Sequence, residues 1–218
     1  MSKHYILNAL VELIWCNLLH IFLVLTLFDL TYLIWQDPKR IVFHIVTDAL
    51  SFPAMSMWFL TNPPNPATIR IESLDELKWL PAGFISRFKQ KGIRDPRYTS
   101  ALNHLRFYLP EVFPSLSKIL LLDHDVVVQK DLSGLWEIDM KNKVNGALET
   151  CNSGNGYHRL DNLVNFSDPS IINKFDPKAC IHAFGMNIFD LKEWRNKGLS
   201  ATYDKWFQAV SVHLVPLH

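Results

Sequence analysis

Short runs of β-branched and other apolar residues alternate with helical patterns through most of the chain after Pro38. Such runs predict strands at residues 40–48, 67–71, 118–123 and 144–150. Helical segments are expected at residues 74–80, 99–111 and 132–138. In the longest of these, Leu102, Leu105 and Leu109 recur at helical spacing behind Thr99, a suitable N-cap. Strands that alternate with helices favour a mostly parallel sheet, so the predicted fold class is α/β.

The N-terminal part of the chain has a different composition. Residues 4–35 contain no Lys or Arg, and their apolar core at residues 13–28 approaches the ~20 residues that a membrane span needs. Three interpretations stay open: a signal-anchor helix, a buried amphipathic helix of a globular domain, or translated sequence that does not belong to the fold. Lysines and arginines flank both sides, so they predict no orientation. We expect residues 1–36 to lie apart from an α/β domain at residues 37–218.

Composition excludes several classes of protein. The chain has 218 residues, is 49% hydrophobic and carries a formal net charge of +1, which fits one packed domain and argues against nucleic acid as a partner. Cys16, Cys151 and Cys180 show no CxxC spacing, which argues against a zinc ribbon or a redox motif. One disulfide with a leftover thiol is compatible with this count.

Two carboxylates, Asp123 and Asp125, interrupt the apolar run at residues 119–128. Burying ionised carboxylates is costly unless they are paired or bind a metal. Alternation along a strand places both on one face, with His124 opposite. At the carboxyl end of a parallel strand, where ligands bind in α/β sheets, the pair could hold a hard divalent cation or merely cap a turn. Asp48 ends another predicted strand and is expected beside them, within reach of the same ion.

Six motifs occur in order along the chain: "HIVTD" (44–48), "SALNHLRFYLPEVFPSLSKILLLDHDVVVQKDLSGLW" (100–136), "VNGALETC" (144–151), "NFSDPSI" (165–171), "FDPKAC" (175–180) and "FGMNIFDLKEWR" (184–195). Together they resemble plant galacturonosyltransferases, and the resemblance covers roughly residues 39–206. These proteins belong to the retaining family of nucleotide-sugar glycosyltransferases that includes glycogenin and bacterial lipopolysaccharide galactosyltransferases.

This resemblance implies a fold and a reaction. The fold is a GT-A-like, Rossmann-related domain with a mostly parallel sheet. The donor is a UDP-sugar, UDP-galacturonate, held with Mn²⁺, and the acceptor is a pectin (homogalacturonan) oligosaccharide. The resemblance also implies a type II Golgi membrane protein with a lumenal catalytic domain, and a homologous glycosyltransferase subunit as a partner.

Individual roles follow from the same resemblance. It makes Asp123 and Asp125 the metal ligands, and no residue is nominated as the catalytic nucleophile. Without the resemblance, His44 would be interpreted as a core histidine, while Arg106 could be a solvated charge on a helix and residues 185–187 a structural turn. The residues implied to bind the donor are His44, Thr47, Asp48, Arg106, His124, Gly185 and Asn187.

The chain also departs from the family pattern. His124 stands where many relatives have an aspartate, as in a D-H-D subset that this chain resembles more closely. Some members of that subset look like partner or anchor subunits. After Trp206 the resemblance stops, and the family's H-x-x-G-x-x-K-P-W segment, with a histidine ligand and a diphosphate-binding lysine, is absent. We therefore expect a domain incomplete at its C-terminus. The function classes are a metal-dependent, retaining galacturonosyltransferase, a non-catalytic partner or anchor subunit of a pectin synthase complex, and an inactive truncated fragment.

Residues 165–167, "NFS", form the single N-x-S/T sequence with x other than proline. In a lumenal chain Asn165 is a candidate for glycosylation, and otherwise it is an ordinary loop asparagine.

Overall fold

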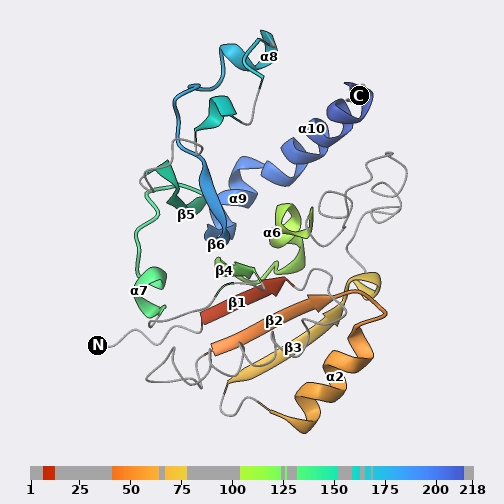
Figure 1. Ribbon diagram of the computed structural model, residues 1–218. Helices are drawn as coiled ribbons and strands as arrows, with labels where there is room; N and C mark the ends of the chain where they lie inside the picture. The colour runs from red at the N-terminus through yellow and green to blue at the C-terminus, as the bar shows by residue number, and fades with distance from the viewer. Residues whose placement is uncertain are drawn as a thin grey trace.

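The computed structural model describes residues 7–12, 41–63, 67–77, 104–123, 126, 132–151, 159–162, 165–167 and 169–213. The described strands form one six-stranded sheet with the order β3-β2-β1-β4-β6-β5 (Figure 1). The strands are β1 (Leu7–Glu12), β2 (Ile41–Thr47), β3 (Thr68–Ser73), β4 (Lys118–Asp123), β5 (Asn145–Glu149) and β6 (His182–Asp190).

One strand of this sheet runs against the others. β3, β2, β1 and β4 pair in parallel, whereas β6 pairs antiparallel with both β4 and β5. The predicted α/β fold with a mostly parallel sheet is confirmed for the first four strands. The reversal of β6 has a consequence for the site, because β6 begins at the same edge of the sheet at which β4 ends.

Leu7–Glu12 corrects one expectation about the N-terminal segment. Residues 1–36 were expected to lie apart from the α/β domain, but β1 lies between β2 and β4 and pairs with both. Leu7 stands opposite Ile41, and Glu12 stands opposite Asp123. The expectation is therefore wrong for this strand. Residues 13–36 lie outside the described residues, and the domain division after residue 36 stays a prediction.

No helix in the described ranges is long and apolar enough to cross a lipid bilayer. The apolar run at residues 13–28, from which a membrane anchor was predicted, lies outside those ranges. The three interpretations of that run therefore stay open.

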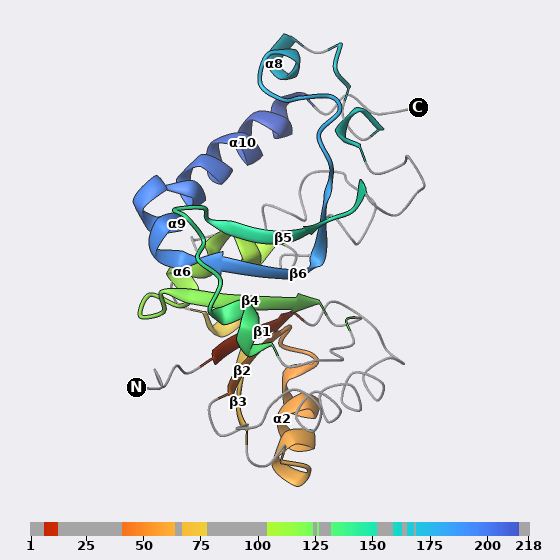
Figure 2. The same ribbon diagram turned by 90° about the vertical axis from the view of Figure 1, so that its left-hand side faces the viewer.

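Helices cover both faces of the sheet (Figures 1 and 2). On one face, α2 contributes Met55 and Phe59 to a core with alternate residues of β2 and β4. On the other face, α6, α9 and α10 pack over Leu121 and Phe189. The helices are α2 (Phe52–Thr61), α6 (Leu109–Val112), α7 (Ser133–Trp136), α8 (Pro169–Ile172), α9 (Leu191–Lys197) and α10 (Leu199–His213), with 3₁₀ turns η2 (Leu74–Glu76), η3 (Arg106–Tyr108) and η5 (Leu160–Asn162).

The strand sequences explain this two-sided burial. In β2, Ile41, Phe43 and Ile45 face α2, while Val46 joins the core on the opposite face. The unbroken apolar run Ile119 to Leu122 in β4 is buried on both faces, as expected for a central strand of a covered parallel sheet.

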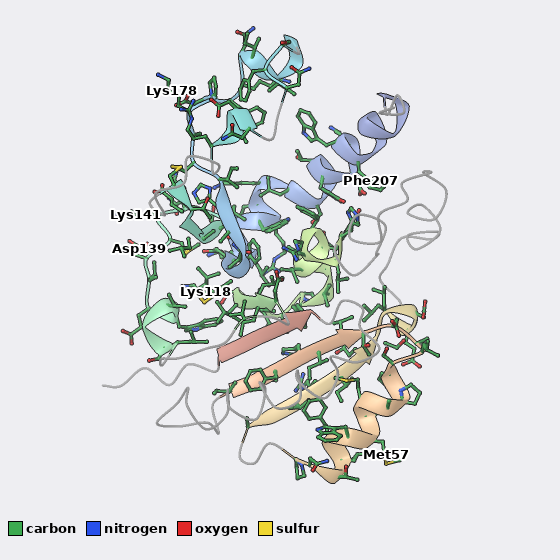
Figure 3. All side chains as sticks on the ribbon, in the orientation of Figure 1. Met57, Lys118, Asp139, Lys141, Lys178 and Phe207 are labelled. Atoms are coloured by element: carbon green, nitrogen blue, oxygen red, sulfur yellow. A yellow bond between two sulfur atoms is a disulfide. The ribbon has the colours of Figure 1, made fainter. Side chains whose placement is uncertain are left out.

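The outer side of α2 is apolar as well. Leu60 is 77% exposed and Met57 is 62% exposed, and Figure 3 shows Met57 on the side of α2 that faces away from the sheet.

The predicted helix at residues 99–111 is confirmed only in part. Its described portion is helical from residue 104, with residues 104–105 followed by the 3₁₀ turn η3 and then by α6, and residues 99–103 lie outside the described residues. Pro110 stands in the first turn of α6, where its missing N–H costs no helical hydrogen bond. The segment therefore bends from one short helical piece into the next, and Leu105 and Leu109 are both fully buried beneath it.

The chain holds one disulfide between described cysteines, Cys151 with Cys180. It joins the second residue after β5 to the second residue before β6 and spans a sequence separation of 29 residues. Beside it, Thr150 donates from its backbone N–H and from Oγ1 to the carbonyl of Ile181, at 3.1 and 2.8 Å. This bond and the hydrogen bonds tie the segment between the two strands to the sheet.

Replacing Gly146 by alanine tests the packing of β6 against β5. A Cβ at Gly146 would come within 2.7 Å of Ile188 Cγ2, so the change is expected to lower the free energy of unfolding by about 1–3 kcal/mol. Gly134, in α7, has nothing within 4 Å of such a Cβ and serves as the control. Gly134→Ala should leave stability unchanged or raise it by up to about 1 kcal/mol. If urea unfolding showed the same change in stability for Gly146→Ala and Gly134→Ala, the close packing of Ile188 over Gly146 would be contradicted.

Candidate functional site

The candidate site lies where β4 ends and β6 begins. Asp123 is the last residue of β4, after four fully buried residues, and a quarter of its side chain is exposed. The sequence predicted this position, because ligands in α/β sheets bind beyond the carboxyl ends of the strands. The carboxylate stands on the same face of β4 as Leu121 and Ile119, the face covered by η3 and α6.

Arg106 supplies a cation beside that carboxylate. Arg106 Nη2 lies 3.4 Å from Asp123 Oδ1, and only 11% of the arginine side chain is exposed. The two residues meet because η3 lies against the end of β4. A largely buried arginine next to a strand-end carboxylate forms a mixed-charge site, which suits an anionic ligand and a cation together.

Gly185 packs against Val126, close to the end of β4. The backbone N–H of Val126 donates to the carbonyl of Asp123 at 3.3 Å, so Val126 lies next to the last residue of that strand. A Cβ at Gly185 would meet Val126 Cγ2 at 3.1 Å, tighter than most real contacts. The absence of a side chain at Gly185 thus allows this part of β6 to lie close to Val126, at the end of the sheet where Asp123 lies, and the predicted role of Gly185 in donor binding stays a prediction.

Asp48 has a structural partner at the end of β2. Its Oδ1 accepts a hydrogen bond from the backbone N–H of Ser51 at 2.7 Å and so shapes the turn into α2. β1 lies between β2 and β4, so the ends of the latter two strands are about 10 Å apart. This geometry gives no support to an ion shared by Asp48 and Asp123, and a donor-binding role for Asp48 stays a prediction.

Thr47 and Ser73 form a pair of hydroxyl residues at the same edge. They are opposite each other in the β2–β3 register, and each is only 2% exposed. Within the described part of the chain, Ser73 Oγ has no hydrogen-bond partner. Sequence analysis named Thr47 but missed Ser73. The strand was predicted to end at residue 71, whereas β3 continues to Ser73. A polar residue at the true end of the strand was the signal that could have identified Ser73.

His44 lies three residues before the end of β2, and its side chain is buried. It is 5% exposed, and its ring packs edge-on against Phe113 with the centroids 4.7 Å apart. Burial, together with the nearby charge of Arg70, lowers the pKa of His44 from 6.5 to about 4. The imidazole is therefore neutral at physiological pH. These contacts are those of a core histidine, and its predicted place near the nucleotide stays a prediction.

Acidification should lower the free energy of unfolding, because His44 is buried in its neutral form. Since its pKa is lower in the folded chain, the unfolded chain binds the proton first, and stability falls as the pH drops from about 6.5 towards 4. Between these values the free energy of unfolding should change by roughly 1 kcal/mol per pH unit. Above pH 6.5 and below pH 4, His44 should contribute no pH dependence. Urea unfolding at several pH values measures it. His44→Gln should make the free energy of unfolding depend less on pH in this interval. An unchanged pH dependence in this variant would show that other groups cause the effect.

Asn187 is the most deeply buried of the predicted polar residues, at 1% exposure. In the sheet it lies between Leu121 of β4 and Ala147 of β5. Its Nδ2 donates to the carbonyl of Ala183 at 3.3 Å, and Oδ1 has no partner among the described residues. Asn187 therefore sits two positions inside the strand from Gly185, and its predicted contact with a sugar stays a prediction.

The second half of the D-x-D motif cannot be placed beside the first. His124 and Asp125 lie outside the described residues, so the predicted Asp123–Asp125 metal pair is not tested. Within the described ranges, no three His, Cys, Asp or Glu side chains gather where they could hold a metal ion. The residues that are placed still suit such an ion, because Asp123 offers a hard oxygen ligand and Arg106 offers a donor to a bound diphosphate.

The chain is similar to a known protein family. The profile of "Glycosyl transferase family 8" matches residues 36–215. Probable galacturonosyltransferase 5 of Arabidopsis thaliana is 53% identical over 181 residues, which is 82% of this chain and 30% of that protein. Hexosyltransferase GAUT11 of the same organism is 46% identical and is covered to 36%. The chain thus spans about a third of the length of these curated relatives.

Solved structures share the architecture at low sequence identity. A galactosyltransferase LgtC in complex with donor and acceptor sugar analogs superposes with a TM-score of 0.63 at 17% identity, over 94% of this chain and 66% of that one. Mouse xyloside xylosyltransferase 1 gives a TM-score of 0.64 at 15% identity, over 94% and 74%. Both are glycosyltransferases with the GT-A fold, so the predicted GT-A-like fold is confirmed.

Proposed function

Because the chain belongs to glycosyl transferase family 8, we propose that it transfers galacturonic acid from UDP-galacturonate to a pectin oligosaccharide with retention of the anomeric configuration. The names of the similar Arabidopsis proteins support the sugar, since several are probable galacturonosyltransferases at 49–53% identity. The Arg106–Asp123 pair at the carboxyl end of β4 is the observation that carries the proposal.

Each placed residue has a task in this reaction. Arg106 binds the donor diphosphate, because a guanidinium donates two parallel hydrogen bonds to phosphate oxygens. Asp123 holds the guanidinium in place at 3.4 Å and offers its remaining lone pairs to a cation. Gly185 allows β6 to lie close to Val126, and the backbone at this position would contact the sugar of the donor.

A divalent cation, Mn²⁺ by family resemblance, would be held by Asp123 together with Asp125. When bound, such an ion supplies Lewis-acid stabilisation of the negative charge on the departing diphosphate. Arg106 adds a fixed positive charge that is largely withdrawn from water, where its interaction with phosphate is stronger.

We further propose that the domain works in the lumen of the Golgi, as a type II membrane protein. The Cys151–Cys180 disulfide supports this compartment, because disulfides persist in the secretory pathway and are rare in the cytosol. A homologous glycosyltransferase subunit is the proposed protein partner, which the D-H-D sequence around His124 favours.

Donor discrimination tests the proposed reaction. Calorimetry with Mn²⁺ should show tighter binding of UDP-galacturonate than of UDP-glucose, and incubation with oligogalacturonide should give a product one sugar longer. Nuclear magnetic resonance of that product should show the anomeric configuration of the donor. Binding without transfer would support a non-catalytic partner subunit instead, and no binding of either UDP-sugar would overturn the proposal.

A further inference from the structure

A glycosylation sequon lies inside the segment that the disulfide closes. Asn165, Phe166 and Ser167 fall between Cys151 and Cys180, which are bonded to each other. The segment connects β5 to β6 and includes α8. Figures 1 and 2 show α8 at the opposite end of the molecule from α2. A bulky group attached just before α8 is therefore compatible with the packed sheet.

The local geometry presents the asparagine to solvent. Asn165 and Ser167 are both exposed, while Phe166 between them is half-buried. The backbone N–H of Ser167 donates to Asn165 Oδ1 at 3.0 Å. This Asx turn fixes the amide of Asn165 through its oxygen. It leaves the amide nitrogen, to which a glycan would be attached, on an exposed side chain.

We propose that Asn165 carries an N-linked oligosaccharide in the folded protein. In the reaction the side-chain amide nitrogen of Asn165 loses a proton and forms a bond to the anomeric carbon of a lipid-linked oligosaccharide diphosphate, and the lipid diphosphate leaves. The same lumen that oxidises Cys151 and Cys180 supplies this donor. Sequon, exposure and disulfide thus point to one compartment, independently of the sugar that the domain itself transfers.

Translation of the full chain with microsomes tests the site. The chain should be protected from added protease and should migrate more slowly than after treatment with a peptide N-glycosidase. Asn165→Gln and Ser167→Ala should each abolish the shift, whereas Ser167→Thr should keep it, because threonine also completes the sequon. Asn162→Gln serves as a matched control, since Asn162 is exposed in the same segment but starts no sequon.

The outcomes separate cleanly. A protected chain with unchanged mobility would show that Asn165 is an unmodified loop asparagine and would overturn the proposal. A chain that the protease digests would overturn it as well, since the proposal places the domain in the lumen. Peptide mass mapping of the native protein should find the modification at position 165, and an unmodified peptide there would count against it.

Discussion

Replacing Asp123 by asparagine is expected to weaken binding of UDP together with Mn²⁺ by at least about 10-fold, because the loss of a group that merely supports a metal ligand already costs about 10- to 100-fold in metal affinity. The change keeps the shape of the side chain but removes its charge. It replaces the charged carboxylate ligand of the proposed ion by a neutral amide, and it removes the negative charge that lies 3.4 Å from Arg106. Calorimetric titration with UDP and Mn²⁺ measures the loss.

Asp176→Asn is the matched control for that titration. Asp176 is exposed, and its Oδ1 accepts the backbone N–H of Lys178 at 2.8 Å, which an asparagine can also do. This variant should bind as the native chain does. Thermal melting must accompany both variants, because Asp123→Asn removes a counter-charge from the largely buried Arg106 and should cost about 1–3 kcal/mol of stability. A folded Asp123→Asn chain with native affinity would remove Asp123 from the proposed site.

Strands with complete local signals could be predicted from the sequence. The run that ends at Asp123 is apolar at every buried position and begins after Pro114 and Ser117, so its identity as β4 needed no tertiary information. β1 is the opposite case. Leu7–Glu12 lies inside a long, mostly apolar stretch without Lys or Arg, with no turn residue to mark its end, and its strand character comes from pairing with β2 and β4. Such pairing is invisible in a single sequence.

The candidate site divides along the same line. The position of Asp123 followed from a rule about strand ends, and the structure agrees. Its partner Arg106 is 17 residues away, and their contact depends on how η3 bends over the sheet. The closeness of Gly185 to Val126 depends on the reversal of β6, which no periodicity in the sequence reveals. Residue types were therefore predictable, while their neighbours were not.

Removing the Cys151–Cys180 disulfide is expected to lower the free energy of unfolding by about 3–4 kcal/mol. The bond closes a loop with a sequence separation of 29 residues, so it restricts the unfolded chain strongly. The double variant Cys151→Ser/Cys180→Ser measures this by urea unfolding without reductant.

Reductant separates the cross-link from the cost of the serine side chains. With dithiothreitol present, the native chain should lose stability and approach the double variant, because both then lack the closed loop. The double variant itself should not respond, since it has no bond between these positions to reduce. An unfolding midpoint of the native chain that is the same with and without dithiothreitol would contradict the pairing of Cys151 with Cys180. It would also remove the support that this bond gives to a lumenal compartment.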